Sequence, residues 1–533
     1  EGFNQLNKPA DICKWSHCMP VGIILSISMQ SATVEYYFLS VVNKHKQTIH
    51  RCRKLCCDAQ ELIIFYVDKY GEDCKQDNQN WIFLDVKVGC WLLDPDHPPN
   101  RFIDALDILG IDKCDMKKTA CFLLLLQSCA AEKLYHKLKQ HDLWKLFIDI
   151  EMKLLPIIAE VRCICVDKQK LNEMGNILEE QINVLEEEAY KSAGKRFQLN
   201  SIQQLSKILY DELKLDQKAN VKVKPTSSLG LKSTSISASH HTLPGVILEY
   251  RHLQKLKSTY IDAMLQHVKG NCIFTTWEQT AAATGRLTSS NPNLQSVPKQ
   301  PLSISSLQKC VQLRSAFIAR PGYVFLGADF QHIEFRVFAH LAKDKSLSEM
   351  FQQPEDIFIT LARLWLGKNG EKISLDEREK TKRIVYAVIY GAGAAKLTEF
   401  LKITEDEARN IITSFNGICP VLQRFRQQVL MECQKLGYLI TIGGRRRNFP
   451  NINSCNSQTR YHTERQAINF IIQGSAADLC KLAMLQVEQK LAERNLSQAV
   501  HLVLQIHDEL LWEVNIENII PVQGKTYDTS SRS

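Results

Sequence analysis

The stretch LQIHDELLW, residues 504–512, contains two adjacent carboxylates in an otherwise apolar run. Asp508 and Glu509 follow His507, whereas most of the remaining residues are typical of a buried strand. Acidic side chains are rarely buried unless they are paired or bind a metal ion. Two interpretations stay open at this point: a hydrophilic turn between two strands, or a hairpin whose tip holds the acids over a metal.

A second acid ends another hydrophobic, strand-like segment. This segment is YVFLGAD, residues 323–329, with Asp329 at its end and Glu334 five residues later in a helical pattern. A helix N-cap would account for Asp329 alone. If Asp329 and Asp508 end neighbouring strands of one sheet, however, their carboxylates can hold two Mg²⁺ ions, and water and substrate phosphates would complete the coordination.

A helical pattern between these acids repeats cationic and aromatic residues on one face. Within REKTKRIVYAVIYG, residues 378–391, every fourth position carries Arg378, Lys382, Tyr386 or Tyr390. A solvated basic face is the usual explanation for the cations, but it does not account for the tyrosines. A nucleoside triphosphate needs cations for its phosphates and aromatic rings for its sugar and base. Lys382 could also donate a proton to leaving pyrophosphate, because phosphoryl transfer requires neutralised charge there.

Composition sets broad limits on the class of protein. A chain of 533 residues is long enough for about three or four domains. Its 66 Lys and Arg against 58 Asp and Glu give a net charge of +8, which permits nucleic-acid binding without demonstrating it. The 18 cysteines form no compact framework, which indicates a reducing compartment. No apolar run reaches membrane-spanning length, and no signal peptide opens the chain.

The motifs, taken in order, resemble those of the family A DNA polymerases. Besides the helix at 378–391, the matching segments are AAATGRLTSSNPNLQSVP (281–298), ADFQHIEFRVFAHLA (328–342), ERQAINFIIQGSAADL (464–479) and QIHDE (505–509). Their order and spacing match the family over about 147–514. Among its subfamilies, the segments VYAVIYGAG, GSAADLCKLAM and TTWEQTAAATGRL are most similar to animal DNA polymerase nu, with polymerase theta next.

The resemblance implies a multidomain α+β fold shaped like a right hand, with palm, fingers and thumb. It also implies a degenerate RNase H-like 3′–5′ exonuclease-like domain before the thumb. The implied boundaries are 1–146 for the inactive exonuclease-like domain, 147–265 for the thumb, 266–345 and 456–533 for the palm, and 346–455 for the fingers.

The resemblance assigns the metal and nucleotide roles. Asp329 and Asp508 would bind two Mg²⁺ ions, and Glu509 would assist nearby. The phosphates would be gripped by Arg378 and Lys382. For the sugar and base, the implied residues are Tyr390, which would stack at the nascent pair, Tyr386 beneath the sugar, and Glu334, which would exclude the ribonucleotide 2′-hydroxyl.

The resemblance also assigns contacts with DNA. Arg286 and Gln473 would probe the minor groove, where most base edges offer an acceptor in a similar place, so that pair shape is checked without reading sequence. Primer and template would be supported by His507, Arg465 and Asn469. For each of these support residues, a purely structural role stays open.

Two positions on the 378–391 helix predict unusual selectivity. Many relatives carry Phe where Tyr386 stands, and a phenol hydroxyl beneath the sugar predicts weak discrimination against dideoxynucleotides. Many accurate relatives carry a small uncharged residue where Arg383 stands, so its guanidinium could reach the templating base and raise errors of T opposite G. A solvated Arg383 is the alternative.

The first 146 residues lack the acids that proofreading requires. A two-metal exonuclease site needs a D-x-E pair and further aspartates, but the segment at 21–29 contains no acid and none lies between Asp115 and Glu132. We therefore expect no proofreading and low fidelity. Asp85 is then interpreted as a surface or turn residue.

Two other functions stay open. After Val514 the chain reads NIENIIPVQGKTYDTSSRS, where the family usually continues with a helix and a closing palm strand, so a catalytically impaired DNA-binding scaffold is one alternative. A phage-like RNA polymerase is the other, and Glu334 argues against it. Primer-template DNA and dNTPs are the expected partners, and no membrane is expected. A nuclear location and a role in repair or translesion synthesis rest on the subfamily alone, and no protein partner is indicated.

Two substitutions within the motifs have no assigned effect. Family members often carry Gln where His332 stands, and His is common where Phe358 stands.

Overall fold

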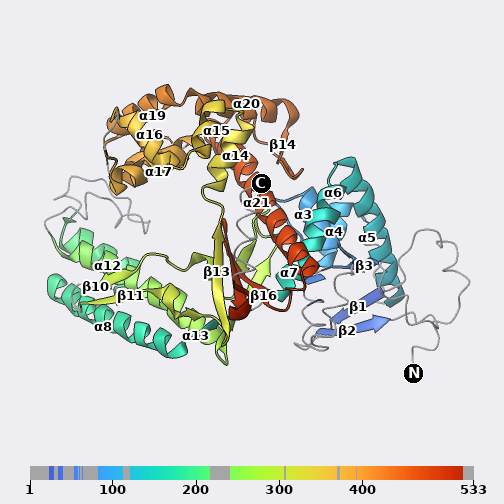
Figure 1. Cartoon of the computed structure of the whole chain (residues 1–533). Helices are drawn as coiled ribbons and strands as arrows, with labels where there is room; N and C mark the ends of the chain where they lie inside the picture. The colour runs from blue at the N-terminus through green and yellow to red at the C-terminus, as the bar shows by residue number, and fades with distance from the viewer. Residues whose placement is uncertain are drawn as a thin grey trace, which may run out of the picture.

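The computed structural model places a small central sheet between groups of helices (Figure 1). The residues that it describes are 23–28, 34–39, 53–57, 59–60, 63, 82–111, 120–161, 163–215, 241–304, 308–368, 372–391, 393–401 and 403–519. Most of the C-terminal segment 515–533 lies outside these residues.

The central sheet contains both acid-bearing segments. Its strands are β13 (Tyr323–Asp329), β17 (Glu509–Asn515) and β16 (Val500–Ile506), which lie antiparallel in the order β13-β17-β16. Alternate residues of β17, Leu510, Trp512 and Val514, are buried in the core, as expected for a strand with one face inward. The predicted strand and hairpin are therefore confirmed.

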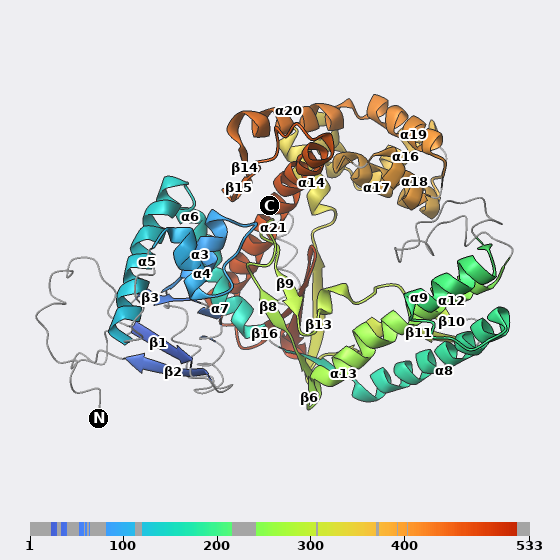
Figure 2. The ribbon, with the colours of Figure 1, turned by 180° about the vertical axis from the view of Figure 1, so that it is seen from behind.

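A single long helix runs beside this sheet. The helix α21 (Ser457–Glu493) packs against α14 (Ile333–Leu341), α20 (Pro420–Leu436) and α7 (Met152–Glu160), and Figures 1 and 2 show it reaching from the upper helices toward the N-terminal region. It is long and apolar enough to cross a membrane, but 67% of its most apolar window is buried inside the protein. We interpret it as a core helix.

The helices above the sheet share a second core. The set comprises α14, α15 (Lys345–Gln352), α16 (Ile357–Leu366), α17 (Leu375–Ile389), α18 (Ala394–Leu401), α19 (Glu405–Ile418), α20 and the hairpin β14 (Tyr438–Ile440) and β15 (Arg446–Asn448). Their apolar faces meet the first half of α21 in one buried cluster. The helix α17 begins with a capping box, in which Ser374 and Glu377 each bond the backbone of the other.

Two long helices extend on another side of the sheet (Figure 1). These are α8 (Lys168–Ala193) and α12 (Leu243–Leu256), which pack against each other. The smaller elements of this part are β5 (Cys163–Val166), α9 (Ile202–Ser206), η5 (Lys207–Glu212), η7 (Lys257–Asp262), α13 (Ala263–His267), β6 (Val268–Lys269), β7 (Cys272–Phe274), β8 (Thr276–Glu278), β9 (Thr288–Ser290), η8 (Leu294–Ser296), β10 (Leu302–Ile304), β11 (Lys309–Val311), η10 (Leu313–Ala316) and β12 (Phe317–Ile318); η11 (Ile516–Asn518) follows β17.

The N-terminal region combines a mixed sheet with helices. The sheet has the order β2-β1-β3-β4, with β1 antiparallel to β2 and parallel to β3. Its strands are β1 (Ile23–Ser28), β2 (Val34–Leu39), β3 (Arg53–Cys56) and β4 (Ile82–Asp85). The helices are α3 (Val86–Leu93), α4 (Phe102–Leu109), α5 (Ala120–Gln140), α6 (Trp144–Leu146) and the π-helical turn η4 (Phe147–Glu151), which leads into α7.

The interpretation of Asp85 as a surface or turn residue is wrong. Its side chain is buried, because it forms the N-cap of α3 and accepts hydrogen bonds from Lys87 N at 2.8 Å and from Ala59 N at 2.6 Å. A buried carboxylate is tolerated when backbone N–H groups at a helix N-terminus surround it. The residue therefore has a structural role that its isolation in the sequence did not indicate.

The predicted domain boundaries stay predictions. The described chain contains two large buried apolar clusters. One buried apolar cluster joins the N-terminal region, the part that contains α8 and α12, and the central sheet. The upper helices have their own cluster. The N-terminal region therefore packs as part of the main body of the described chain.

Candidate active site

The tip of the β16–β17 hairpin lies against the end of β13. Asp329 is the register partner of Glu509, and Phe330 N donates a hydrogen bond to Asp508 O at 3.2 Å. His507, at the tip, has the left-handed φ of 57°. Two chain segments that are far apart in the sequence thus bring three acids to one end of the central sheet.

The helix N-cap alternative for Asp329 is wrong. The helix α14 begins at Ile333 with His332 as its N-cap, and Asp329 instead accepts a hydrogen bond from Gln331 N at 2.6 Å. His332 also has a left-handed φ of 64°, so the chain turns sharply between the strand and the helix. This turn leaves Asp329 exposed beside Asp508.

The electrostatics of the acid pair are unfavourable as it stands. Burial raises the pKa of Asp508, and the neighbouring charge of Asp329 raises it further. Within the described residues, no Lys or Arg forms an ion pair with either carboxylate, although the structure contains many other ion pairs. Two carboxylates that repel each other and have no Lys or Arg ion-pair partner in the described part of the chain suit a site that receives positive charge from outside the chain.

The helix α17 presents its predicted stripe toward one aromatic ring. The cationic groups of Arg378 and Lys382 lie 5.4 Å and 6.0 Å from the centre of the Phe358 ring. At the other end, the rings of Tyr386 and Tyr390 stack with centroids 6.3 Å apart. The spacing of four residues therefore produces a continuous face with cations at one end and aromatic rings at the other.

Glu334 connects the stripe to a different part of the chain. It lies in the first turn of α14 and accepts hydrogen bonds from the Arg286 guanidinium and from the Tyr390 hydroxyl. Burial raises the pKa of Tyr390, and the Glu334 charge raises it further, while a hydrogen bond with Gln473 opposes this shift. Four residues predicted for stacking at the nascent pair, sugar discrimination and minor-groove contact thus lie close together.

The two unexplained substitutions contact each other. The His332 and Phe358 rings meet edge to face, with centroids 4.7 Å apart. Burial lowers the pKa of His332, and the Lys382 charge lowers it further.

Asp356 is a residue of the site that the sequence did not predict. Arg378 Nη2 donates a hydrogen bond to Asp356 Oδ2 at 2.7 Å. Its sequence signal, an aspartate before the apolar helix α16, is that of an ordinary N-cap.

The residues predicted to support DNA lie along one side of α21 and on the hairpin. Arg465, Asn469 and Gln473 follow at intervals of four, which places them on one helix face. The Asn469 Oδ1 atom is buried and has no hydrogen-bond partner within the described residues. His507 and Arg383 are exposed.

Comparisons with known proteins agree with this geometry. Residues 168–529 match the family model for DNA polymerase family A. The DNA polymerase I of Chloroflexus aurantiacus is 35% identical over 398 residues, which cover 73% of this chain and 41% of that protein. The thermostable DNA polymerase I of Thermus filiformis is 36% identical over 400 residues, which cover 73% of this chain and 46% of that protein. The chain thus spans less than half of the length of these relatives.

A solved structure extends the likeness to the three-dimensional fold. The POL domain of Pol1 from M. smegmatis, in complex with DNA primer-template and dNTP, superposes with a TM-score of 0.77 at 28% identity. The match covers 91% of this chain and 83% of that one. The predicted right-hand polymerase fold is therefore confirmed.

Proposed function

The chain belongs to DNA polymerase family A, and we propose on this basis that it adds dNMP to a primer 3′ end as the template directs, with release of pyrophosphate. The observation that carries the proposal is the position of Asp329 and Asp508, which have no Lys or Arg ion-pair partner within the described residues. The pair lies near Tyr386, at the aromatic end of the cationic and aromatic face of α17. Primer-template DNA and dNTPs are the proposed partners.

The residues present fit a divalent cation. The described residues contain no group of three or more His, Cys, Asp or Glu side chains placed to hold a metal, so the chain would contribute the carboxylates of Asp329 and Asp508. Mg²⁺ is commonly held by one or two carboxylates, with water and substrate phosphates as its other ligands. When bound, two such ions would make the 3′-hydroxyl more acidic and neutralise charge on the phosphates.

The protein's own residues would orient the nucleotide. In the reaction, the primer 3′-oxygen forms a bond to the α-phosphorus, and the bond from that phosphorus to the bridging oxygen of pyrophosphate breaks. Arg378 and Lys382 would bind the phosphates, and Lys382 would give its proton to the leaving oxygen. For Arg378, phosphate binding would replace its ion pair with Asp356.

The other end of the α17 face would receive the sugar and base. Tyr390 would stack at the nascent pair, and Glu334, held by Arg286 and Tyr390, would occupy the space that a 2′-hydroxyl needs. Glu509 would assist beside the acid pair. Arg286 and Gln473 would contact the minor groove, and Arg465, Asn469 and His507 would support the primer and template.

The finer assignments are also proposals. We propose that the chain is most similar to animal DNA polymerase nu, acts in repair or translesion synthesis in the nucleus, and copies DNA with low fidelity and without proofreading. The absence of acids from the sequence segment 21–29 and between Asp115 and Glu132 supports the last point. Side chains of 21–29 and the segment 112–119 lie outside the described residues.

Primer extension on a defined template with Mg²⁺ tests the main proposal. We expect templated dNMP addition by the unmodified chain and none by Asp508→Ala. DNA binding without extension would instead favour the impaired scaffold. Extension with rNTPs as efficient as with dNTPs would favour an RNA polymerase and contradict the role of Glu334.

A further inference from the structure

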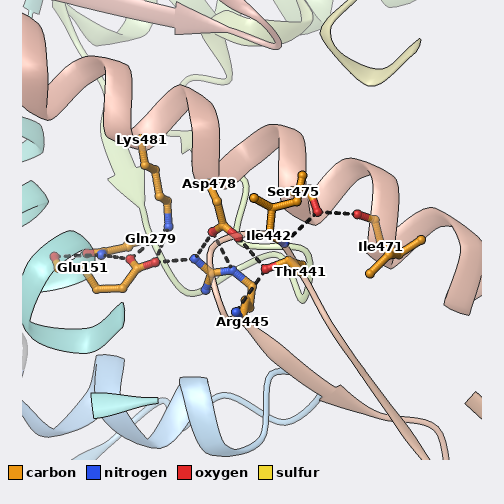
Figure 3. A network of polar contacts seen from close by, with 9 residues as sticks. All are labelled: Glu151, Gln279, Thr441, Ile442, Arg445, Ile471, Ser475, Asp478 and Lys481. Carbon is orange, nitrogen blue, oxygen red and sulfur yellow. Dashed lines mark hydrogen bonds and ion pairs between the residues drawn. The ribbon is translucent and has the colours of Figure 1, made fainter. Parts of the chain in front are cut away.

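A second group of charged residues lies deep inside the described structure, away from the hairpin tip. Glu151, Arg445, Asp478 and Lys481 are each at most 1% exposed, and Figure 3 shows them in direct contact. Arg445 Nη2 donates to Glu151 Oε1 at 2.5 Å and to Asp478 Oδ1 at 2.9 Å. Lys481 Nζ donates to both Glu151 oxygens, at 2.8 Å and 2.9 Å. We call these four residues the buried network.

The buried network joins parts of the chain that are distant in the sequence. Glu151 ends η4, the last of the elements assigned above to the N-terminal region. Arg445 lies between β14 and β15, whereas Asp478 and Lys481 lie on α21. The ring of Trp91, on α3, lies 4.9 Å from the Arg445 guanidinium and 5.3 Å from the Lys481 ammonium. The buried network therefore joins the N-terminal region to the upper hairpin and to the long helix, in addition to the ion pair between Arg447 and Asp96.

Stability alone does not account for this arrangement. Removing charges from water is costly, and apolar residues of similar volume often stabilise a core at least as well as a buried ion pair does. Buried charges do impose one geometry, however, because each must meet its partner. A geometry fixed in this way can hold a neighbouring part of the candidate site in place.

The turn that carries Arg445 is bound tightly to α21. The Thr441 hydroxyl donates to Asp478 Oδ2 at 2.5 Å and accepts from Arg445 N at 3.0 Å. Ile442 N donates to Ser475 Oγ at 3.1 Å. These contacts, drawn in Figure 3, fix both ends of the turn with respect to the helix.

The same turn lies directly on two glycines, each next to a residue of the candidate site. A Cβ on Gly285 would lie 2.4 Å from Arg445 Nε, and a Cβ on Gly474 would lie 2.7 Å from Thr441 Cγ2. Gly285 precedes Arg286, and Gly474 follows Gln473. No side chain separates the turn from the backbone at either glycine, so any movement of the turn is transmitted to both neighbours.

We propose that the buried network, acting through Thr441 and Arg445, positions Arg286 and Gln473 and so sets the preference for matched over mismatched primer ends. The N-terminal region, through Trp91 and Glu151, is part of this support. The inference rests on the proposed function, because the positions of Arg286 and Gln473 can affect primer selection only if both residues contact the minor groove. Such contacts report on pair shape only when donors are held at fixed positions.

The sharpest test adds one methyl group and then removes another. In Gly474→Ala the new Cβ meets Thr441 Cγ2, which moves the helix or the turn and displaces Gln473. We expect the ratio of matched to mismatched primer extension to fall about tenfold, the effect of about one lost hydrogen bond. Thr441→Ser removes the clashing methyl and keeps the hydroxyl, so the double variant should recover the original ratio, and Thr441→Ser alone should keep it.

Gly417→Ala is the matched control, because Gly417 also lies in a helix and a Cβ there meets nothing within 4 Å. A ratio in Gly474→Ala equal to that of Gly417→Ala overturns the inference, and so does a double variant that fails to recover. If Gly474→Ala does not fold, the double variant must still fold with the original ratio. Failure of the unmodified chain to extend a matched primer would instead refute the proposed function, and the inference with it.

The N-terminal part of the inference has its own variant. Trp91→Leu keeps an apolar side chain but removes the aromatic face that meets Arg445 and Lys481. We expect a smaller fall in the same ratio, about threefold, because a cation–π contact contributes roughly 0.5–1 kcal/mol or more when desolvated. An unchanged ratio in a folded Trp91→Leu chain would remove the N-terminal region from the support.

Discussion

Acidic residues occur in two opposite charge environments in this protein. In the buried network, Glu151 and Asp478 meet Arg445 and Lys481, so two negative charges are balanced by two positive ones. At the hairpin tip, Asp329 and Asp508 face each other, and no cation of the described chain pairs with them. The pKa values move accordingly: that of Asp508 is raised by burial and by Asp329, whereas that of Glu151 is lowered.

The difference separates acids that hold the fold from acids that await a ligand. Burial by itself would raise the pKa of Glu151, but the Lys481 and Arg445 charges outweigh it and lower the value to about 2. Around Asp508 a backbone hydrogen bond and His507 lower the pKa, but burial and the Asp329 charge outweigh them. A pair of uncompensated carboxylates costs folding free energy, and such a cost is typical of functional sites.

Replacing an acid by its isosteric amide should have its largest effect on primer extension at the hairpin tip. Asp508→Asn removes one charge from the unpaired acids, so we expect extension to fall about a thousandfold or more, the effect of several kcal/mol of lost charge stabilisation. Affinity for DNA should change little, because Lys and Arg supply the phosphate contacts. Single-turnover extension and DNA titration measure the two effects. Retention of more than a few per cent of the rate would contradict the two-metal assignment.

The same chemical change in the buried network should affect stability. Glu151→Gln leaves Arg445 and Lys481 with Asp478 alone, and an uncompensated buried charge typically costs about 3–5 kcal/mol. Urea unfolding of this variant, compared with Asp508→Asn, makes the contrast direct. Equal stability of the two variants would show that the two kinds of acid do not differ as described.

Stability against acid should also report on Glu151. Its pKa is lowered from 4.5 to about 2 in the folded chain, so between these pH values the unfolded chain binds more protons. The stabilisation is therefore fully present above about pH 4.5 and is lost as the pH falls toward 2, with roughly 3 kcal/mol at stake. Unfolding at several pH values should give a shallower slope in Glu151→Gln. An identical slope would mean that Glu151 does not titrate in this range.

The sequence indicated the role of Asp329 and Asp508 at the hairpin tip, but not that of Glu151 and Asp478 in the buried network. Asp329 and Asp508 each end an apolar strand, and a strand periodicity of two fixes which residues face the core. These patterns indicated the hairpin and the stripe but left their structural alternatives open, and the resemblance to the family A motifs then assigned both to one site. The local pattern carries the information because each element presents its own functional residues.

The buried network had no such signal. Glu151, Arg445 and Lys481 come from three distant segments, and each lies in a stretch where a charged residue is ordinary. Asp85 was misread for the same reason, since its burial depends on Ala59 and on the start of α3. Contacts between distant segments depend on tertiary packing, which periodicity and motifs do not contain.

The Tyr386 hydroxyl, near the acids of the hairpin tip, is also expected to bind the incoming nucleotide. Its ring stacks on Tyr390, and its pKa is raised by burial and then by Glu334 and Asp508, which places it near the acids. A hydroxyl beneath the sugar could replace the hydrogen bond that a nucleotide without a 3′-hydroxyl lacks. Tyr386→Phe should therefore increase discrimination against dideoxynucleotides by roughly 1–3 kcal/mol. Competition between dNTP and ddNTP measures it, and equal rejection by both proteins would refute the idea.

Cationic residues, like the acids, include some that are paired inside the protein and some that are exposed without an ion pair in the described part of the chain. A substitution of the exposed Arg383 has the smallest expected effect of those considered. Arg445 is buried between two acids, whereas Arg383 is exposed on α17. It follows Lys382 and points about 100° away around the helix axis.

A guanidinium that reaches the templating base would favour guanine, whose O6 and N7 are both acceptors. A stabilisation of ~1.4 kcal/mol for a displaced G·T pair would raise that error about tenfold. We therefore expect Arg383→Ala to lower insertion of T opposite template G about tenfold and to change other errors less. Insertion of each dNTP opposite each template base measures this. If the G·T error stays the same in Arg383→Ala, the residue is an ordinary solvated cation, and exposure without a partner does not by itself mark a residue that awaits a ligand.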